Sequence, residues 1–555
     1  MPVVHFVDKN VLVTVESGAT ILEAARKADL ILESPCNGMG TCGKCKVQLP
    51  ISQLSNIRPS ENRQAVSAEE AAQGVVLSCQ SHIYGDIEVK FYVQNQNKTL
   101  KILSEGKSFA FNIKNLITKK FDGKNTLVFG KGKKLGEETG NTENENYGLA
   151  VDIGTTTVVA SLIDVTSGEE KASVSALNTQ SLTAQDVLSR IQFASSDNGL
   201  AKMYQNITDQ INRMIAELEA QTGISRSNIY EVIYSGNTTM IHLAVNVNPK
   251  SLGKFPYTPA IYGGNSLSAA EYRIAISPFG YLYLPPIISA YVGPDITSGV
   301  LACQLDQIKG TALFLDIGTN GEMVLAKDGS LFATSTAAGP AFEGMNISCG
   351  MRANKGAIEF FEINGEKINI KTIGNAPPVG ICGSGLLDIV GELVRVGVIG
   401  SNGKLVSPEK QDLPQFLASR LLKKDGKLCF EVAEQIYLTQ KDIRQVQLAK
   451  GAVRAGVEAL LAKQNIDASN VDVVEIAGSF GYHLRANSLI NIGLLPPQFE
   501  GKVLFVGNTS KSGARAFLLN YDFRESIKEI VKQIGVVELG NTSDFERLFV
   551  KCLSF

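Results

Sequence analysis

The chain opens with short runs of apolar and β-branched residues separated by turns. Residues 3–7 and 11–15 flank an Asp-Lys-Asn turn, which predicts a β-hairpin. Residues 20–28 carry apolar side chains at helical spacing, and residues 87–92 alternate apolar and polar positions as a half-buried strand does. The pattern predicts a small β-rich domain over residues 1–92.

From residue 147 onward the pattern changes to buried strands punctuated by glycine turns. Two segments repeat each other: residues 149–164 (LAVDIGTTTVVASLID) and residues 313–326 (LFLDIGTNGEMVLA). Each has an apolar run, the tetrapeptide Asp-Ile-Gly-Thr and a second apolar run. An internal repeat of this kind predicts a duplicated, two-lobed α/β domain. We place lobe I at residues 147–311 and lobe II at residues 312–555.

Residues 93–146 between these parts are rich in charge. Ten lysines and two acidic residues lie between residues 98 and 134, and four glutamates follow between residues 137 and 145. A switch of charge in a polar stretch predicts a solvated linker, and docking to an acidic partner is the alternative. A strand or two within the linker stays possible on the apolar pattern.

The composition indicates a folded chain of several domains. Its 555 residues are 44% apolar and 19% charged, which excludes wholesale disorder. The 53 basic and 55 acidic residues leave a net charge of −2, so we expect no nucleic-acid partner. We see neither a secretory signal nor an apolar run long enough to span a membrane, and therefore expect a cytoplasmic protein without a membrane partner.

Four of the nine cysteines are clustered near the N-terminus. The spacing is Cys36-x5-Cys42-x2-Cys45-x33-Cys79, with glycines between the first three. Four thiolates are the usual ligand count of an iron–sulfur cluster. Zinc is the rival metal, but zinc ribbons prefer two short Cys-x2–4-Cys knuckles. The spacing favours a 2Fe–2S cluster. We expect the remaining cysteines to be structural: Cys303, Cys349, Cys382, Cys429 and Cys552.

The two Asp-Ile-Gly-Thr turns have the composition of phosphate-binding loops. We call residues 152–157 the first loop and residues 316–321 the second loop. Their glycines and threonines offer backbone N–H groups and hydroxyls to phosphate oxygens. Asp152 and Asp316 offer hard oxygen ligands for hydrated Mg²⁺. If the two loops face each other across the lobes, they would clamp a triphosphate.

Further glycine clusters fit the same site. They lie at residues 338–344, 380–385 and 477–481. The last of them follows an apolar run, and such a turn lets a purine ring lie close to the backbone. From these clusters and the two loops, the residues that we expect to bind the nucleotide are Gly154, Thr155, Thr156, Thr157, Gly318, Thr319, Gly321, Gly339, Gly383, Ser384, Gly478, Ser479, Phe480 and Gly481.

Both parts of the chain resemble known families. Residues 1–92 resemble a plant- or adrenodoxin-type ferredoxin, which implies a β-grasp fold and one-electron transfer. Residues 147–555 resemble the ASKHA superfamily of acetate and sugar kinases, heat-shock-70 chaperones and actin. That resemblance implies that the first and second loops are the phosphate 1 and phosphate 2 motifs. It also implies that residues 477–481 are the adenosine motif.

The combination of the two parts resembles the reductive activators of corrinoid-dependent enzymes. The strings that carry the resemblance are CNGMGTCGKC, AVDIGTTTV, YSGNTTM, DIGTNGE, AGPAFEG, ICGSGLLD and IAGSFG. The resemblance implies an ATP-dependent enzyme that passes one electron from the 2Fe–2S cluster to the Co(II) corrinoid of a methyltransferase system and restores Co(I). An uphill gap of ~200 mV corresponds to about 4.6 kcal/mol, because ~59 mV is tenfold in an equilibrium constant. ATP hydrolysis would cover that gap.

The same resemblance implies the partners and leaves the catalytic roles open. The partners are a corrinoid protein and an electron donor such as a reductase or ferredoxin, and a homodimer is possible. The hydrolytic water needs a polar residue to orient it, and the candidates are Asp316, Asn320 and Glu322, with Asp152 and Asp316 positioning Mg²⁺.

Three alternatives belong to other classes. One is an ASKHA-type small-molecule kinase or ATPase with a redox-sensing ferredoxin domain. Another is an activator of a radical dehydratase, against which the self-contained N-terminal cysteine set argues. The last is a non-enzymatic, ATP-gated electron carrier, which would not turn ATP over.

Overall fold

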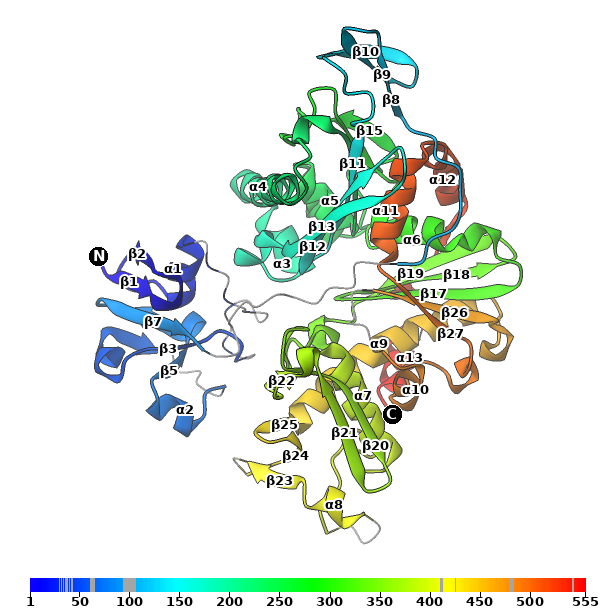
Figure 1. Ribbon diagram of the computed structural model, residues 1–555. Helices are drawn as coiled ribbons and strands as arrows, with labels where there is room; N and C mark the ends of the chain where they lie inside the picture. Colours follow the sequence, from blue (N-terminus) through cyan, green and yellow to red (C-terminus); the bar gives the residue numbers. More distant parts are fainter. Residues whose placement is uncertain are drawn as a thin grey trace.

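The computed structural model shows a small N-terminal domain beside a large two-lobed body (Figure 1). The structure describes residues 1–555 except 29, 31, 33, 35–37, 39, 41–42, 60–64, 93–105, 410–412, 425, 479–483 and 542–543. Within the described residues, no helix is long and apolar enough to cross a membrane.

The N-terminal domain is a five-stranded mixed sheet with a helix packed on it, which confirms the predicted β-grasp arrangement. β1 (Val3–Phe6) pairs antiparallel with β2 (Val11–Thr14) and parallel with β7 (Ile87–Phe91). α1 (Ile21–Lys27) begins at a capping box in which the Thr20 hydroxyl accepts the backbone N–H of Glu23. The remaining elements are β3 (Lys46–Gln48), β4 (Ile57–Pro59), α2 (Ala68–Ala72), β5 (Val75–Leu77) and β6 (Ser81–Ile83).

The stretch predicted as a linker contains more structure than the expected strand or two. β8 (Ile117–Phe121), β9 (Asn125–Gly130) and β10 (Lys133–Thr139) form an antiparallel sheet. Several lysines of the stretch form ion pairs with acids of the same chain: Lys107–Glu475, Lys114–Asp522, Lys119–Glu138 and Lys134–Glu137. These pairs give four of the ten lysines an acidic partner within the chain.

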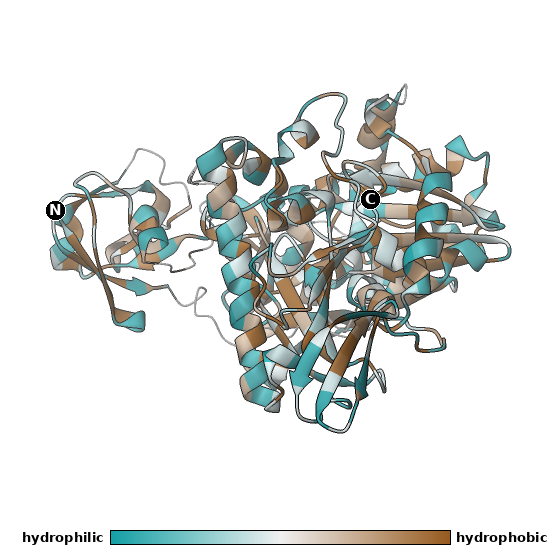
Figure 2. Cartoon of the chain, turned by 90° about the horizontal axis from the view of Figure 1, so that it is seen from above, coloured by the Kyte–Doolittle hydropathy of each residue, from teal (hydrophilic) through white to brown (hydrophobic). Residues whose placement is uncertain are grey.

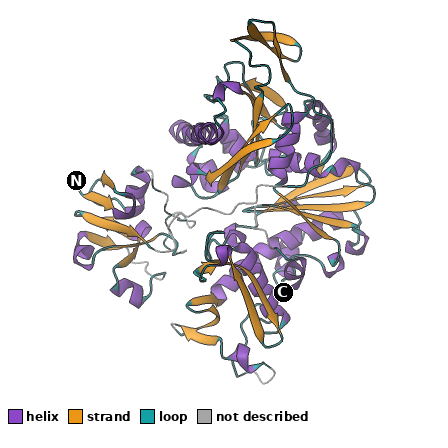
Figure 3. Cartoon of the chain, in the orientation of Figure 1, coloured by secondary structure: helices purple, strands orange, loops and turns teal. Residues whose placement is uncertain are grey.

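The lobes contain two sheets of the same topology, as the sequence repeat predicts (Figure 3). Each has three antiparallel strands followed by two parallel ones. Lobe I orders β13 (Glu170–Leu177), β12 (Thr157–Asp164), β11 (Tyr147–Ile153), β14 (Ile229–Gly236) and β16 (Tyr281–Leu284), with β15 (Asn265–Ser268) at the edge. Lobe II orders β19 (Ser330–Thr336), β18 (Gly321–Lys327), β17 (Thr311–Ile317), β26 (Val473–Ala477) and β27 (Val503–Gly507), with β28 (Gly535–Val536) beside β19.

Hydrophobic residues are concentrated on the inner strands, and helices cover the sheets (Figure 2). Lobe I carries α3 (Val187–Phe193), α4 (Asp197–Thr222) and α5 (Thr238–Ala244). Lobe II adds β20 (Ala357–Asn364), β21 (Lys367–Thr372), β22 (Gly380–Ile381), α7 (Gly383–Arg395), α8 (Gln415–Ala418), β23 (Leu421–Lys424), β24 (Lys427–Ala433), β25 (Ile436–Thr439), α9 (Gln440–Lys463), α10 (Ala486–Asn491) and α13 (Phe545–Cys552).

Two helices join the lobes. α6 (Pro294–Cys303) packs against α11 (Thr509–Leu519), and both share one hydrophobic core with the two large sheets. A Cβ on Gly513 would lie 2.1 Å from the carbonyl oxygen of Ser298, so glycine is what allows the helices to cross this closely. α11 and α12 (Asp522–Gln533) therefore return to lobe I, although our division at residue 311 assigns them to lobe II.

Candidate functional site

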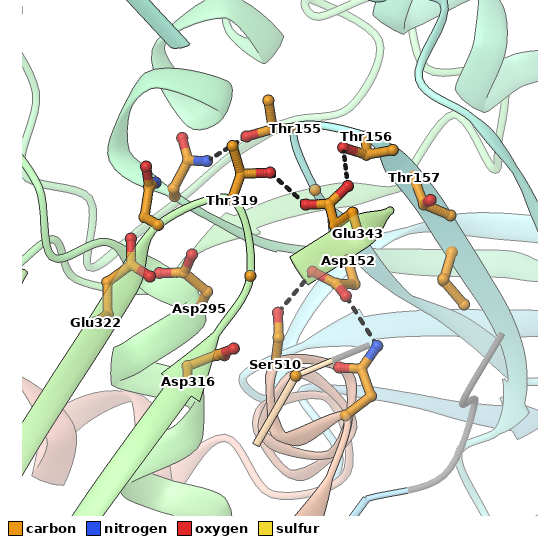
Figure 4. A pocket seen from close by; sticks show the side chains of 17 residues that line it. Asp152, Thr155, Thr156, Thr157, Asp295, Asp316, Thr319, Glu322, Glu343 and Ser510 are labelled. Atoms are coloured by element: carbon orange, nitrogen blue, oxygen red, sulfur yellow. Dashed lines mark hydrogen bonds between the residues drawn. The ribbon is translucent and has the colours of Figure 1, made fainter. Parts of the chain in front are cut away.

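A cavity of about 130 Å³ lies between the lobes (Figure 4). Most of the predicted nucleotide and catalytic residues meet there, from both loops. Its lining consists of Asp152, Gly154, Thr155, Thr156, Thr157, Val159, Asn237, Asp295, Asp316, Gly318, Thr319, Asn320, Glu322, Glu343, Gly478, Asn508 and Ser510.

Four predicted residues do not line the cavity. The N–H of Gly339 donates to the carbonyl oxygen of Thr319 at 2.8 Å, so it supports the second loop from behind. Gly321 begins β18, and a Cβ there would lie 2.9 Å from the Thr336 hydroxyl. Gly383 and Ser384 begin α7, where the Ser384 hydroxyl donates to the Glu359 carbonyl. Ser479, Phe480 and Gly481 lie outside the described residues.

Side chains and backbone outside the first loop donate hydrogen bonds to its carbonyl oxygens. The side-chain amide of Asn178 donates to Gly154 at 2.8 Å, and its backbone N–H donates to Thr156 at 2.9 Å. Arg190 Nη2 donates to Thr155 at 2.6 Å. Asn178 and Arg190 are fully buried. With three successive carbonyls turned away, the loop presents hydroxyls to the cavity, as an anion site requires.

We expect Arg190→Met to weaken ATP binding about tenfold and to lower the melting temperature. The change leaves the Thr155 carbonyl without its buried donor, which costs about 1–3 kcal/mol. Calorimetric titration with Mg-ATP and thermal unfolding measure the two effects. Arg213→Met, on the exposed face of α4, is the control and should change neither. Unchanged ATP affinity in Arg190→Met would contradict this role.

Carboxylates face the cavity from both lobes: Glu322 is buried, and Asp152, Asp295 and Asp316 are half-buried. Asp152 accepts hydrogen bonds from Asn508 Nδ2 at 2.9 Å and from the Ser510 hydroxyl at 2.7 Å, which partly offset the rise of its pKa caused by burial. Burial, followed by the nearby Asp152, raises the pKa of Asp316 to about 7. Burial, followed by Asp316, raises the pKa of Asp295 to about 8. Burial and these neighbours also raise the pKa of Glu322.

This acidic group fits a hydrated divalent cation. Among the described residues, no three His, Cys, Asp or Glu side chains converge closely enough to form a direct metal cage. Mg²⁺ usually keeps several waters and takes only one or two carboxylates together with substrate phosphates. Asp152 and Asp316 are the next-to-last residues of β11 and β17, the strands that lead into the two loops, which suits such a role.

Five polar residues that line the cavity were not individual candidates in the sequence. Asn237 donates from Nδ2 to the Thr155 hydroxyl at 3.0 Å and caps α5. It lies within the string YSGNTTM, and Glu343 lies within AGPAFEG, so both had a local signal. Asp295, Asn508 and Ser510 reach the cavity only through the packing of α6 and α11.

The predicted cluster site is described in part. The Sγ atoms of Cys45 and Cys79 lie 3.2 Å apart and are buried, as two ligands of one metal centre would be. Gly38, Gly40 and Gly43 have φ of 86°, 73° and 68°, which favours glycine in the cysteine loop. Cys36 and Cys42 lie outside the described residues.

The other five cysteines lie in the lobes. Burial raises the pKa of each thiol, which disfavours the thiolate that a metal ligand needs.

Known protein families match both the N-terminal domain and the two lobes. A 2Fe–2S iron–sulfur cluster binding domain matches residues 4–84, the RACo middle region matches residues 147–308, and the C-terminal ASKHA domain of RACo matches residues 310–555. A solved structure of a reductive activator for corrinoid, iron–sulfur protein has 31% identity and a TM-score of 0.73, over 100% of this chain and 98% of that one. The chain belongs to the family of corrinoid reductive activators.

Two curated relatives place the activator among enzymes of the same kind. The corrinoid activation enzyme RamQ of Eubacterium limosum is 33% identical over 74% of this chain and 70% of its own length. The [Co(II) methylated amine-specific corrinoid protein] reductase of Methanosarcina barkeri is 26% identical over 74% of this chain and 77% of its own length. The match of the middle region to residues 147–308 falls on our lobe I. These findings confirm the predicted family, the 2Fe–2S domain and the ASKHA fold with its ATP and Mg²⁺.

Proposed function

We propose that this activator passes one electron to the Co(II) corrinoid of a partner protein and restores Co(I), with ATP hydrolysis driving the uphill step. Cys36, Cys42, Cys45 and Cys79 would hold the 2Fe–2S cluster, which supplies a one-electron donor when bound. The corrinoid cobalt gains that electron, and ATP and water become ADP and phosphate.

The observation that carries the proposal is that one chain joins the cluster domain to the cavity between the two loops. The two parts also touch: Lys44 Nζ donates to the carbonyl oxygen of Gly350 in lobe II at 2.6 Å. Lys44 lies next to Cys45 in sequence and is 6% exposed. A movement of lobe II relative to lobe I would therefore act, through this hydrogen bond, on the segment beside the cluster ligands.

We propose the following roles at the cavity. Asp152 and Asp316 position Mg²⁺ through water, and the hydroxyls and N–H groups of residues 155–157 and 319–321 bind phosphate oxygens. Asp316, Asn320 or Glu322 orients the attacking water. Gly478, with Ser479, Phe480 and Gly481, binds the adenosine.

We also propose the remaining partners. An electron donor such as a reductase or ferredoxin would reduce the cluster, and the corrinoid protein would accept the electron. We further propose that two copies of the activator form a homodimer. Light scattering of the purified chain tests this.

An anaerobic assay tests the proposed reaction. The activator with its reconstituted cluster is mixed with a reductant, Mg-ATP and a purified Co(II) corrinoid protein, and visible absorption follows the conversion to Co(I). We expect conversion only when activator and ATP are both present. Conversion that proceeds equally without ATP would refute the proposal. Phosphorylation of a sugar or carboxylic acid, unaffected by loss of the cluster, would instead identify a kinase.

A further inference from the structure

The side chain of Glu343 bridges the two loops of the cavity (Figure 4). The Thr156 hydroxyl of the first loop donates to Glu343 Oε2 at 2.7 Å. The Thr319 hydroxyl of the second loop donates to Glu343 Oε1. One carboxylate thus connects lobe I, through Thr156, with lobe II, which carries both Thr319 and Glu343.

The backbone fixes Glu343 to lobe II. It ends the short helix η9 (Pro340–Glu343), which lies between Gly339 at φ 78° and Gly344 at φ 75°. A Cβ on Gly344 would lie 2.5 Å from the Met351 carbonyl oxygen, so this tight turn needs glycine. Ala341 and Phe342 of the helix are buried in the lobe II core. The Glu343 carboxylate is therefore held at a defined position and contacts lobe I through Thr156.

The hydroxyls that Glu343 accepts are those that the proposed function assigns to phosphate. A hydroxyl has a single proton to donate, so Thr156 and Thr319 cannot serve the carboxylate and a phosphate oxygen with the same proton. The carboxylate and the phosphates also repel each other as like charges. Phosphate oxygens can therefore accept from these two hydroxyls only when the Glu343 carboxylate has released them.

We infer that Glu343 is a latch that holds the two loops together in the nucleotide-free activator and is displaced when the phosphates of ATP arrive. This inference rests on the proposed function, because it assumes that ATP binds between the loops. Without nucleotide the Glu343 side chain connects the two lobes, and with ATP bound the phosphates connect them instead. Such an exchange makes the contact between the lobes depend on whether ATP is bound.

Glu343→Gln tests the latch. The amide carries no charge to repel phosphate, and it has one acceptor oxygen where the carboxylate has two. We expect the dissociation constant for Mg²⁺ and a non-hydrolysable ATP analogue to fall about tenfold, the effect of one or two hydrogen bonds of ordinary strength. Glu366→Gln, at the exposed turn between β20 and β21, is the matched control and should bind like the unchanged chain.

Hydrogen exchange separates a latch from a merely structural residue. Without nucleotide, we expect the backbone amides of residues 154–157 and 318–321 to exchange faster in Glu343→Gln than in the unchanged chain. With the analogue bound, the two proteins should protect these amides equally. A purely structural fault would persist when the analogue is bound, and that result would overturn the latch.

The binding experiment distinguishes failure of the latch from failure of the proposed function. If the unchanged chain binds the analogue and Glu343→Gln does not bind it more tightly, the latch is wrong and the proposed ATP site stands. If the unchanged chain does not bind the analogue, the proposed function fails and the latch fails with it. Unchanged affinity together with a hundredfold loss of hydrolysis would overturn the latch in favour of a catalytic Glu343.

Discussion

Replacing Asp316 with alanine is expected to lower ATP hydrolysis at least a hundredfold and to leave the visible spectrum of the cluster unchanged. Asp316 is the next-to-last residue of β17, the strand that leads into the second loop, and its carboxylate faces the cavity from lobe II. In the proposed site it positions Mg²⁺ or the attacking water. Removing one preorganised group that stabilises charge in a transition state commonly costs about 10²–10³ in rate.

The change should be local to the nucleotide site. Asp316 is half-buried among other carboxylates that raise one another's pKa, so its removal relieves repulsion and should not unfold the lobe. Phosphate release measures hydrolysis, and absorption measures the cluster. Asp197→Ala, in the exposed first turn of α4, is the control and should hydrolyse ATP normally. Hydrolysis within threefold of the unchanged rate in Asp316→Ala would show that the cavity is not where ATP is cleaved.

Replacing Cys79 with serine is expected to abolish corrinoid reduction while ATP binding is retained. Cys79 is buried, and its Sγ lies 3.2 Å from that of Cys45. Serine removes one of the four thiolates, which are the usual ligands of a 2Fe–2S cluster. Every described residue that lines the nucleotide cavity belongs to the lobes, so we expect the cavity not to depend on this cysteine.

Three measurements check this result: the iron content, the anaerobic formation of Co(I) and the titration with Mg-ATP. Cys552→Ser is the matched control, because this partly exposed cysteine at the end of α13 lies outside the cluster domain. The control should keep its iron and reduce the corrinoid at the unchanged rate. If Cys79→Ser reduced the corrinoid as fully as the unchanged chain does, the electron would not pass through the cluster.

The parts of the site that are local in sequence were predictable. Each loop is formed by a hairpin turn between neighbouring strands, so its residues are consecutive and its composition reveals it. Asp295, Asn508 and Ser510 were not predictable in this way. They belong to α6 and α11, and only the crossing of these helices between the sheets brings them to Asp152 and the cavity.

Two other patterns have a packing role that the sequence did not reveal, because glycine and lysine have more than one use. The glycines near residue 383 suggested a nucleotide turn, but a Cβ on Gly385 would lie 2.0 Å from the Ile358 carbonyl oxygen. There the glycine allows α7 to approach β20. The lysine-rich stretch suggested a solvated linker, but the sheet of β8–β10 packs Ile117 and Val128 against Tyr230 of lobe I. Lysines such as the exposed Lys120 and Lys133 concealed the short alternating strands of that sheet.

The central claim is that ATP drives an electron uphill to the corrinoid. The most direct test holds the electron donor at a fixed potential and measures the ratio of Co(I) to Co(II) at equilibrium without ATP and at steady state after Mg-ATP is added. For a gap of ~200 mV, with ~59 mV for each factor of ten, the ratio without ATP should be near ~1 in 2,500. With ATP we predict that Co(I) becomes the major form, and that Asp316→Ala stays at the ratio seen without ATP. The same ratio with and without ATP would contradict the account.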